Sequence, residues 1–435
     1  DRLQEVAEFR IGMATGQNEV YVRNWHEVQS DHFSRSSESR AAAKESSQRW
    51  FPYAKGGPFR RWAGNQEFVV NWQNDGALLQ NTMHPDGKRI WAHNFNLKNI
   101  FKPSLAWTQV TTGKPSFRYY DDGYLYDAAA GLGQAKDESE IFLVIGLLNS
   151  KVAESALDSM NPTINLLPGD LGNVPFRHAE TSELGQRAVR IAQSDWDAFE
   201  TSWDFMTCPL LQSGHHAVTL EATYIALRTH WKGMTEEMQR LEEENSRILI
   251  DAYGLQDELT PEVPLNEITL TCNPAYRYGV NNSEEDRESR LRSDTMAEFL
   301  SYAVGCMFGR YSLDEAGLLL ASQGESLADY LVRIPEPTFM PDDDNVIPMI
   351  DLEGDWFEDD ISERFKQFLR VTFGDEHYGE NLAFIEDALG KSIQKYFLKD
   401  FYNVHWKRYK KRPIYWLFSS PKGTFNALVY MHRYT

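Results

Sequence analysis

Short runs in the first third of the chain place hydrophobic side chains at every second position, which is the period of a β-strand. Residues 66–73 carry Phe68, Val70 and Trp72 at this spacing, and residues 105–111 form a second strand candidate. These runs predict a sheet in the N-terminal part of the chain.

Residues 117–126 predict a β-hairpin, because two aromatic-rich runs flank Asp122-Gly123, a dipeptide typical of tight hairpin turns. A two-stranded ribbon of this kind can enter the major groove of duplex DNA. The hairpin is therefore both a structural prediction and a functional one.

Helical patterns accompany these strands. Residues 1–30 predict a helix with strand-like spacing at residues 19–22, and residues 34–47 predict an exposed loop or mobile helix. A capping-box pair at Asp137 and Glu140 precedes an apolar run, so we expect one helix there that continues to about Met160. The first domain is predicted to be α/β and to cover residues 1–178.

Beyond residue 178 the hydrophobic period becomes helical. Residues 182–203 predict a helix, and hydrophobic positions between Leu220 and Ala252 alternate steps of four and three, which is a heptad pattern. The pattern fits either a helix packed within this chain or a coiled coil with a partner. Gly254 is the expected stop, and Glu242-Glu243-Glu244 is expected to make the outer face acidic. Residues 179–260 are thus a predicted helical spacer.

The last segment, residues 261–435, predicts a mainly helical domain. Helices are expected near residues 295–307, 362–372 and 380–401, a loop at 335–348, and strands at 414–418 and 427–430. The predicted fold class is an α/β domain followed by a mainly α-helical spacer and a C-terminal domain with a small β element.

Composition narrows the class of protein. A chain of 435 residues exceeds one ordinary core, so two or three domains are expected. No run of eighteen apolar residues and no signal-peptide pattern occurs, which predicts a cytoplasmic protein without a membrane partner. Cys208, Cys272 and Cys306 lack metal-ligand spacing and are expected to be buried, reduced thiols. Because residue 1 is Asp and not Met, we expect a fragment or a processed product.

The net charge of −20 argues at first against a polyanionic partner. Residues 1–178, however, hold 19 basic and 20 acidic side chains, whereas the remainder holds 25 basic and 44 acidic ones. The first domain can therefore present a basic face, while the rest repels DNA except where basic residues cluster.

The stretch Trp50 to Gly76 mixes basic side chains with aromatic residues and glycines. Arginine can bond phosphate oxygens or guanine edges, and glycine lets a backbone approach closely, so the stretch is a candidate DNA-reading surface. An aromatic-rich core strand with two solvated arginines is the alternative. The candidate DNA-binding residues of the whole chain are Lys55, Arg60, Arg61, Lys88, Arg89, Lys114, Arg118, Lys407, Arg408, Lys410 and Lys411.

Two subsets of these candidates have specific roles. At least one of Arg61, Arg89 and Arg118 is predicted to contact a base. The run from Lys407 to Arg412 is the densest basic cluster, and it fits either a phosphate clamp or a surface docked on the domain's own acidic groups.

The same stretch resembles the target-recognition region of the large adenine-specific DNA methyltransferases of BREX-type phage-exclusion systems. Four further stretches match that family in the same order: Gly12–Asn18 with Val22–Trp25, Asn161–Asn165, Ser301–Ser312, and Lys411–Ser420. The resemblance implies duplex DNA as a partner, a methyl transfer from S-adenosylmethionine to adenine N6, and other phage-defence proteins as further partners. It also implies that the family's methyltransferase domain lies before residue 1 and that its chain continues past Thr435.

Catalytic motifs are not recognisable in the chain. Asn273-Pro-Ala-Tyr276 departs at its third position from the Asn-Pro-Pro-Tyr turn that holds a flipped adenine, and no apolar strand with a glycine turn precedes it. His215, His216, His377 and His405 accompany no nucleophile elbow. Asp342-Asp343-Asp344 with Glu353 only partly fits a calcium loop, which favours a solvated acidic turn. We therefore expect no catalytic residue, metal or cofactor in this chain, with S-adenosylmethionine bound by the parent enzyme.

Three functions fit these observations. The favoured hypothesis is the DNA target-recognition and scaffold part of an adenine-N6 methyltransferase. A non-enzymatic scaffold that recruits other defence proteins is the first alternative, and an independent methyltransferase using Asn273 to Tyr276 is the second. DNA binding distinguishes the first alternative, and cofactor binding distinguishes the second.

Overall fold

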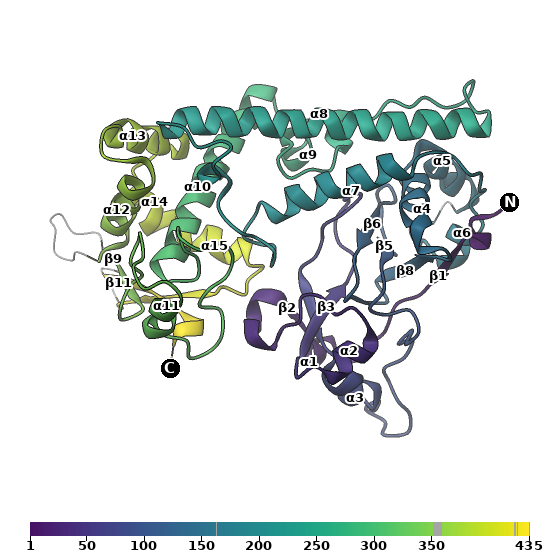
Figure 1. The fold of residues 1–435 in the computed structure, drawn as a ribbon, viewed down its shortest axis with the longest axis horizontal. Helices are drawn as coiled ribbons and strands as arrows, with labels where there is room; N and C mark the ends of the chain where they lie inside the picture. Colours follow the sequence, from purple (N-terminus) through teal and green to yellow (C-terminus); the bar gives the residue numbers. More distant parts are fainter. Residues whose placement is uncertain (162, 351–358, 422, 424, 435) are drawn as a thin grey trace. The chain divides into compact units, whose positions relative to one another are not determined.

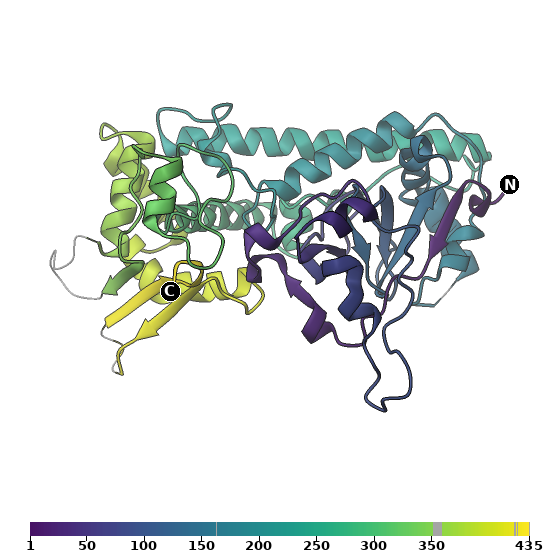
Figure 2. The same ribbon diagram turned by 60° about the horizontal axis from the view of Figure 1, so that its bottom comes forward.

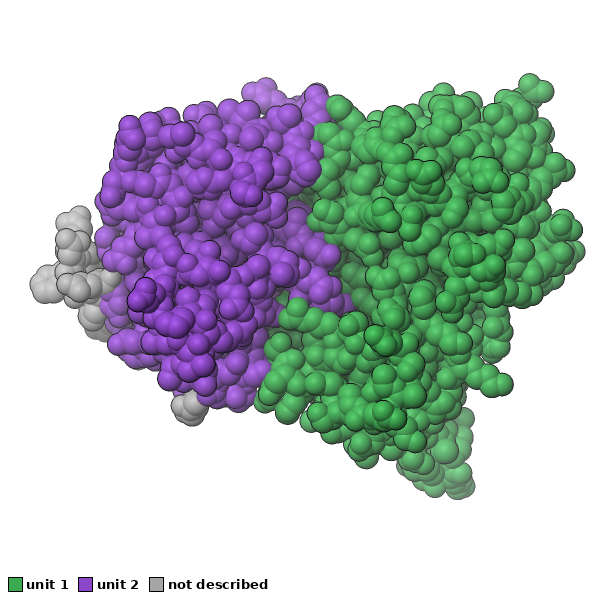
Figure 3. Space-filling view, viewed as in Figure 1, with its two compact units in different colours: residues 1–196, 233–277 green, residues 197–232, 278–435 purple. Residues whose placement is uncertain are grey.

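The computed structural model describes residues 1–161, 163–350, 359–421, 423 and 425–434 (Figure 1). The chain forms two compact units, coloured separately in Figure 3. Unit 1 contains residues 1–196 and 233–277, and unit 2 contains residues 197–232 and 278–435. This grouping divides the predicted spacer between the two units, so three separately folding domains stay a prediction.

Unit 1 contains two four-stranded sheets. The first has the order β1 (Ala7–Arg10), β8 (Ala130–Ala135), β5 (Ser104–Thr108) and β6 (Phe117–Tyr120). The second has the order β2 (Val22–Asn24), β4 (Phe68–Asn71), β3 (Trp50–Ala54) and β7 (Leu125–Tyr126). The predicted strands at 66–73 and 105–111 are therefore confirmed as β4 and β5.

The predicted hairpin at residues 117–126 is wrong. Strand β6 pairs with β5 in the first sheet, whereas β7 pairs in parallel with β3 in the second. Gly123 does turn the chain, with φ of +96°, but the turn carries it from one sheet to the other. A local turn signal specifies a reversal of direction and leaves the partner of each strand to long-range packing.

The predicted helix over residues 1–30 is also wrong. This segment contains a 3₁₀ turn at Leu3–Glu5, then β1, the short helix α1 (Asn18–Tyr21) and β2. Strand β1 lies at the sheet edge, where Phe9 faces Gly133 of β8. Pairing with β8 overrides the weak helical pattern.

The other helices of unit 1 cover its sheets. They are α2 (Arg40–Glu45), α3 (Gln73–Gln80), α4 (Ile141–Leu148), α5 (Lys151–Met160), α6 (Pro168–Gly172), α7 (Ser182–Asp197) and α9 (Pro274–Tyr278), the last two ending at the unit boundary. Helix α4 packs against β5, β6 and β8 of the first sheet.

One predicted helix at residues 141–160 is broken into α4 and α5. The Asn149 side chain bonds both the N–H and the carbonyl oxygen of Phe117 in β6, at 3.0 Å each. Ser150 then caps α5 by accepting the N–H of Ala153. Two polar side chains that bond elsewhere thus end one helix and begin the next.

Helix α8 (Leu220–Tyr253) confirms the predicted helix, and Gly254 follows it with φ of +70°. Its seam packs within this chain, since Leu227, Met238 and Leu241 are each about 1% exposed. The expected acidic outer face is wrong at Glu242, which is 2% exposed and points inward.

Unit 2 is mainly helical with a three-stranded antiparallel sheet of order β10-β11-β9. Its elements are the start of α8, α10 (Glu284–Met307), α11 (Leu327–Arg333), β9 (Val346–Ile350), α12 (Ile361–Phe373), α13 (Tyr378–Leu389), α14 (Ile393–Tyr396), a π-helical turn at Phe397–Phe401, α15 (Tyr402–Arg408), β10 (Tyr415–Ser419) and β11 (Phe425–Tyr430). The sheet confirms the predicted strands near 414–418 and 427–430, and β9 adds one within the expected loop.

The predicted fold class is confirmed: an α/β region comes first, helices dominate the middle, and a small sheet lies near the C-terminus. Within the described ranges, no helix combines the length and the apolar character that a membrane crossing requires.

Candidate nucleic-acid interface

The chain after β3 buries Arg60. Its Nη2 lies 2.8 Å from Oδ2 of Asp195 on α7, and the guanidinium stacks 5.0 Å from the centre of the Trp196 ring. Nη1 also donates to the Thr271 hydroxyl at 2.9 Å. With 2% of its surface exposed, Arg60 ties this segment to α7.

Arg61 lies in a second buried cluster. Its Nη1 is 2.9 Å from Oε2 of Glu242, and its Nη2 is 3.4 Å from Glu267. The indole Nε1 of Trp62 donates to the other Glu242 oxygen at 2.7 Å. Burial raises the pKa of Glu242, while Arg61 and Trp62 act in the opposite direction by stabilising the carboxylate. We call Arg61, Trp62, Glu242 and Glu267 the Arg61 cluster.

The backbone of this segment adopts left-handed conformations next to the buried arginines. Trp62 adopts φ of +71°, a left-handed conformation that is strained for a bulky residue. Gly64 has φ of +114°, and a Cβ there would lie 2.3 Å from Nε of Arg60. Only glycine allows the chain to pass so close to the buried guanidinium.

Arg118 in β6 is fully buried as well. Its guanidinium donates to the Arg60 carbonyl oxygen at 3.1 Å and to the hydroxyls of Ser116, Thr108 and Tyr120 at 3.3 Å each. Arg118 therefore braces the backbone of the segment that holds Arg60.

Lys114 is partly exposed but paired. Its Nζ lies 2.7 Å from Glu154 and 2.8 Å from Glu267, so it extends the Arg61 cluster toward the surface. Burial opposes its charge, but the two carboxylates raise the pKa of Lys114.

These positions correct the expectation of solvated arginines in the central stretch. Arg60, Arg61 and Arg118 have satisfied guanidinium groups inside the protein, so a base contact by Arg61 or Arg118 would require those bonds to break. The aromatic-rich core alternative describes the stretch better, except that the arginines are buried too.

Three other candidates of unit 1 face solvent to different degrees. Lys55 is half-buried, with Nζ 5.6 Å from the centre of the Phe68 ring. Lys88 and Arg89 are exposed on the connection between α3 and β5. The Arg89 side chain is 68% exposed, and its nearest carboxylate contact is Asp86 at 3.9 Å. Arg89 is the candidate base-contacting residue that lies on the surface.

In unit 2, the basic run from Lys407 to Arg412 also contains both buried and exposed side chains. Arg408 is largely buried, with 14% of its side chain exposed and Nη1 2.7 Å from Oε1 of Glu200. Lys407, Lys410 and Lys411 are exposed, and Lys410 and Lys411 adopt φ of +51° and +66° in the turn between α15 and β10. Lys411 also lies over the Trp406 ring, 5.4 Å from its centre.

Asn273-Pro-Ala-Tyr276 serves the fold. The Asn273 amide donates to the carbonyl oxygens of Leu265 and Ile268, and the Tyr276 hydroxyl donates to the Phe59 carbonyl oxygen at 2.5 Å. Asn273 is 1% exposed. The Asn273 side-chain oxygen, which in an Asn-Pro-Pro-Tyr turn would accept the amino group of a flipped adenine, here accepts the Ala275 N–H at 3.1 Å.

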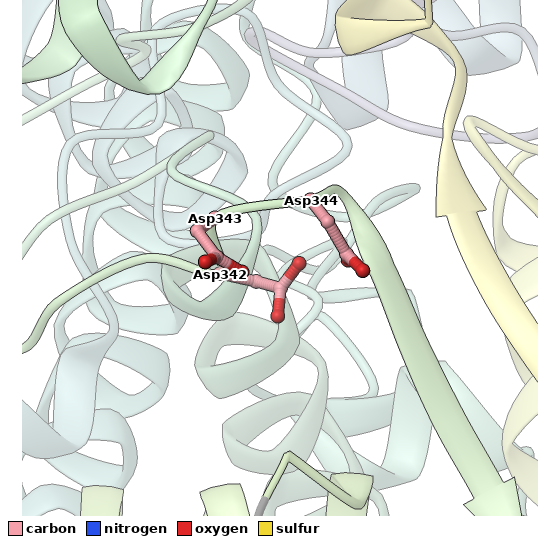
Figure 4. Close-up of side chains that lie close together, drawn as sticks. All are labelled: Asp342, Asp343 and Asp344. Atoms are coloured by element: carbon pink, nitrogen blue, oxygen red, sulfur yellow. The ribbon is translucent and has the colours of Figure 1, made fainter.

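The acidic turn at Asp342, Asp343 and Asp344 brings three carboxylates together, with ligand atoms within 4.8 Å of one another (Figure 4). The Val346 N–H donates to both Asp342 and Asp344, at 3.2 and 2.8 Å. Asp343 and Asp344 are exposed, as expected for a solvated acidic turn, but Asp342 is only 7% exposed, so the prediction is wrong for that residue. Glu353, the fourth residue of the comparison with a calcium loop, lies outside the described residues.

The histidines and cysteines singled out in the sequence make contacts within the fold. Nε2 of His405 accepts the N–H groups of Ile414 and Tyr415 at 3.2 Å each. His216 contacts the Thr372 carbonyl oxygen, and His377 pairs with Glu380. The three cysteines are buried free thiols, as predicted.

Sequence reasoning missed the acidic partners Asp195, Glu242 and Glu267. Glu242 follows Leu241 of the heptad seam, and a helix packed in a globular unit buries a wider stripe than a two-position seam. That width is the signal that could have identified Glu242 as an inward residue.

Comparison with known proteins gives two matches that cover nearly the whole of this chain. The chain is 37% identical over 450 residues to the adenine-specific methyltransferase PglX of Lacticaseibacillus casei (strain Zhang), covering all of this chain and 35% of that protein. It is 35% identical over 440 residues to the adenine-specific methyltransferase BrxX of Escherichia coli O9:H4 (strain HS), covering 96% and 34%. The chain spans about a third of the length of these relatives.

No protein-family model matches the chain. Among solved structures, the DNA complex of the Type IIL restriction-modification enzyme MmeI has a TM-score of 0.33 at 10% identity, covering 59% of this chain and 34% of that one. A likeness at that level supports no structural argument.

Proposed function

We propose that this chain, which belongs with the PglX and BrxX adenine-specific methyltransferases by similarity over its whole length, provides the DNA target recognition of such an enzyme. In this proposal, unit 1 binds duplex DNA and selects the site to be methylated. The parent protein transfers a methyl group from S-adenosylmethionine to adenine N6, through a domain outside the third of the relatives' length that this chain matches.

One observation carries the proposal beyond the resemblance: Lys88 and Arg89 are exposed together on a single turn within residues 1–178, a segment with 19 basic and 20 acidic side chains. Neighbouring cations on a projecting turn create a local positive potential that attracts phosphate. Arginine at such a position can donate hydrogen bonds to base edges in a groove of the duplex. Arg89 is the proposed base-contacting residue, and Lys88 and Lys55 are the proposed phosphate contacts.

The buried arginines have a supporting role in this proposal. The Arg60–Asp195 pair and the Arg61 cluster fix the segment after β3 to α7 and α8. A rigid support keeps a reading turn in one position, which reduces the entropy lost on binding.

The test is DNA binding by the complete 435-residue chain. Selection from a random duplex library should enrich one asymmetric motif, and affinity is then measured on that motif and on random DNA. Arg89→Ala should cost about 1–3 kcal/mol on the motif and much less on random duplex, whereas Lys88→Ala should weaken both and reduce the salt slope by about 1.

Two outcomes contradict the proposal. If the chain enriches no motif and binds DNA no more tightly than an acidic control protein, target recognition does not reside here. If Arg89→Ala also lowers the affinities for the motif and for random DNA by the same factor, DNA is bound but the base contact lies elsewhere, and residues 34–47 become the next candidates.

Without DNA binding, the scaffold alternative gains support, in which α8 and the acidic unit 2 recruit other phage-defence proteins. The independent-methyltransferase alternative requires Asn273 and Tyr276 to release the backbone oxygens that they bond. A cytoplasmic location follows from the proposed role and is part of the proposal.

A further inference from the structure

The connection between α3 and β5 contains a short hairpin of residues 82–91. The Trp91 N–H donates to the Thr82 carbonyl oxygen at 2.8 Å, and the His84 N–H donates to that of Arg89 at 2.9 Å. Between these bonds, Met83 and Ile90 form an antiparallel bridge. Gly87, with φ of +67°, closes the turn at the tip.

One face of the 82–91 hairpin is fixed to the rest of unit 1. The Thr82 hydroxyl bonds the Tyr21 hydroxyl at 2.7 Å. The Trp91 ring lies against Gly16, where a Cβ would be 2.7 Å from the ring, and His84 packs edge-on against Trp91 at 5.1 Å between ring centres. These contacts hold the hairpin in a defined orientation.

The opposite face presents two apolar side chains to solvent. Successive residues of a strand point to opposite faces, so Met83 and Ile90 both face away from the side that carries Thr82, His84 and Trp91. Met83 is 47% exposed and Ile90 52%, and Leu78, at the end of α3, is 68% exposed. Single exposed apolar residues are ordinary. A side-by-side pair on a fixed hairpin forms a contiguous apolar surface, and its hydration is unfavourable.

Cations lie at the tip of the same hairpin. Lys88 and Arg89 are exposed, whereas Asp86 is bonded to the Lys88 N–H at 2.9 Å and lies 3.0 Å from His84. In both ribbon views, the connection that contains the hairpin extends away from the rest of unit 1 (Figures 1 and 2). The hairpin thus carries an apolar pair on one face and two cations at its tip, a combination that fits a duplex groove better than a flat apolar protein surface.

We propose that the 82–91 hairpin enters the minor groove and places Met83 and Ile90 against one base step, partly unstacking it and bending the duplex. This rests on the proposed function, and it assigns a deforming role to side chains that carry no hydrogen-bonding group. Apolar wedges such as Met and Ile loosen a base step in this way, and the bend brings more phosphate to Lys88 while Arg89 contacts base edges in the same groove. The cost of unstacking depends on the sequence, so the wedge adds selectivity at positions read by no hydrogen bond.

The test uses the complete chain carrying M83S and I90S together. End-labelled duplexes of the selected motif report bending by energy transfer, and 2-aminopurine placed at successive steps reports unstacking. The wild-type chain should bend the motif duplex and increase the 2-aminopurine fluorescence at one base step. The double variant should lose both signals, bind the motif at least tenfold more weakly, and bind random duplex within threefold of the wild type.

A control removes two aliphatic side chains of unit 2 that are even more exposed. Val218 and Val332 are 70% and 83% exposed, and V218S with V332S should leave bending, fluorescence and affinity unchanged. M83S/I90S should bind a motif duplex with a mismatch at the base step of increased fluorescence more tightly than the matched motif, because the mismatched step is already unstacked.

The outcomes separate the two proposals. Absence of DNA binding by the wild-type chain contradicts the proposed function. Motif binding with no bend or unstacking, or with both retained in M83S/I90S, overturns the wedge and leaves target recognition intact. Because both side chains face solvent, the double variant should melt at the wild-type temperature.

Discussion

At the scale of single residues, burial decides what each basic side chain can do. Arg60 and Arg61 are 2% and 4% exposed, while the Arg89 side chain is 68% exposed. All three are arginines among aromatic or turn residues, so residue type alone does not distinguish them. Inside the protein, the guanidinium group must be paired, and its function becomes structural.

Arg61→Met tests this structural role. Glu242 would remain buried with only the Trp62 indole as a close donor, so the free energy of unfolding should fall by about 3–5 kcal/mol. Arg61→Met combined with Glu242→Gln should recover much of that loss, because no buried charge is left unpaired.

Chemical denaturation measures both variants, with Arg89→Met as the exposed control, expected within about 0.5 kcal/mol of the wild type. Unchanged stability of Arg61→Met together with a selective loss of motif binding would restore Arg61 as a base contact.

Asp342 supplies a pH prediction. Burial, together with Asp344, raises the pKa of Asp342 to about 6. A carboxyl whose pKa is higher in the folded state favours folding when protonated, so its contribution is lost as pH rises from about 4 through about 6. Asp343 also lies in this turn, and the guanidinium groups of Arg364 and Arg433 interact electrostatically with Asp342.

Asp342→Asn keeps an oxygen that can accept the Val346 N–H and removes the titration. The melting temperature of the variant relative to the wild type should rise between pH 4 and pH 7. A difference that is flat or falls over that range would show that the two arginines, and not burial, dominate the energetics of this carboxylate.

At the scale of elements, the turn between α15 and β10 is distinctive because consecutive lysines adopt left-handed conformations. If this turn contacts phosphate, Lys410→Glu with Lys411→Glu should weaken binding to all DNA sequences by the same factor and reduce the salt dependence of binding.

Lys395→Glu with Lys399→Glu, also exposed in unit 2, is the control with the same change of charge. Unchanged DNA affinity with a lowered melting temperature in the Lys410/Lys411 variant would instead identify the turn as a surface docked on the acidic groups of this protein.

At the scale of the whole molecule, the relatives are named as methyltransferases, but this chain matches only about a third of their length. Calorimetric titration of the complete chain with S-adenosylmethionine should show no tight binding. Micromolar binding that Asn273→Ala abolishes would contradict this expectation and favour the independent-methyltransferase alternative.

The sequence by itself determined those features that depend on local periodicity. The four-three spacing predicted α8 because a helix repeats its faces every few residues, and the strand spacing predicted β4, β5, β10 and β11. Ordered motifs along the chain also predicted its similarity to adenine-specific methyltransferases, because such motifs are recognised from residue order alone.

Only the tertiary structure decided features that depend on partners far apart in the sequence. Arg61 and Glu242 are separated by 181 positions, and nothing near either residue specifies the other. The same reason explains why residues 117–126 join two sheets and not one hairpin, and why Met83 and Ile90 stay exposed while similar side chains form the core. Local pattern fixes the direction of a side chain relative to its own element, but burial is fixed by what the rest of the chain places against it.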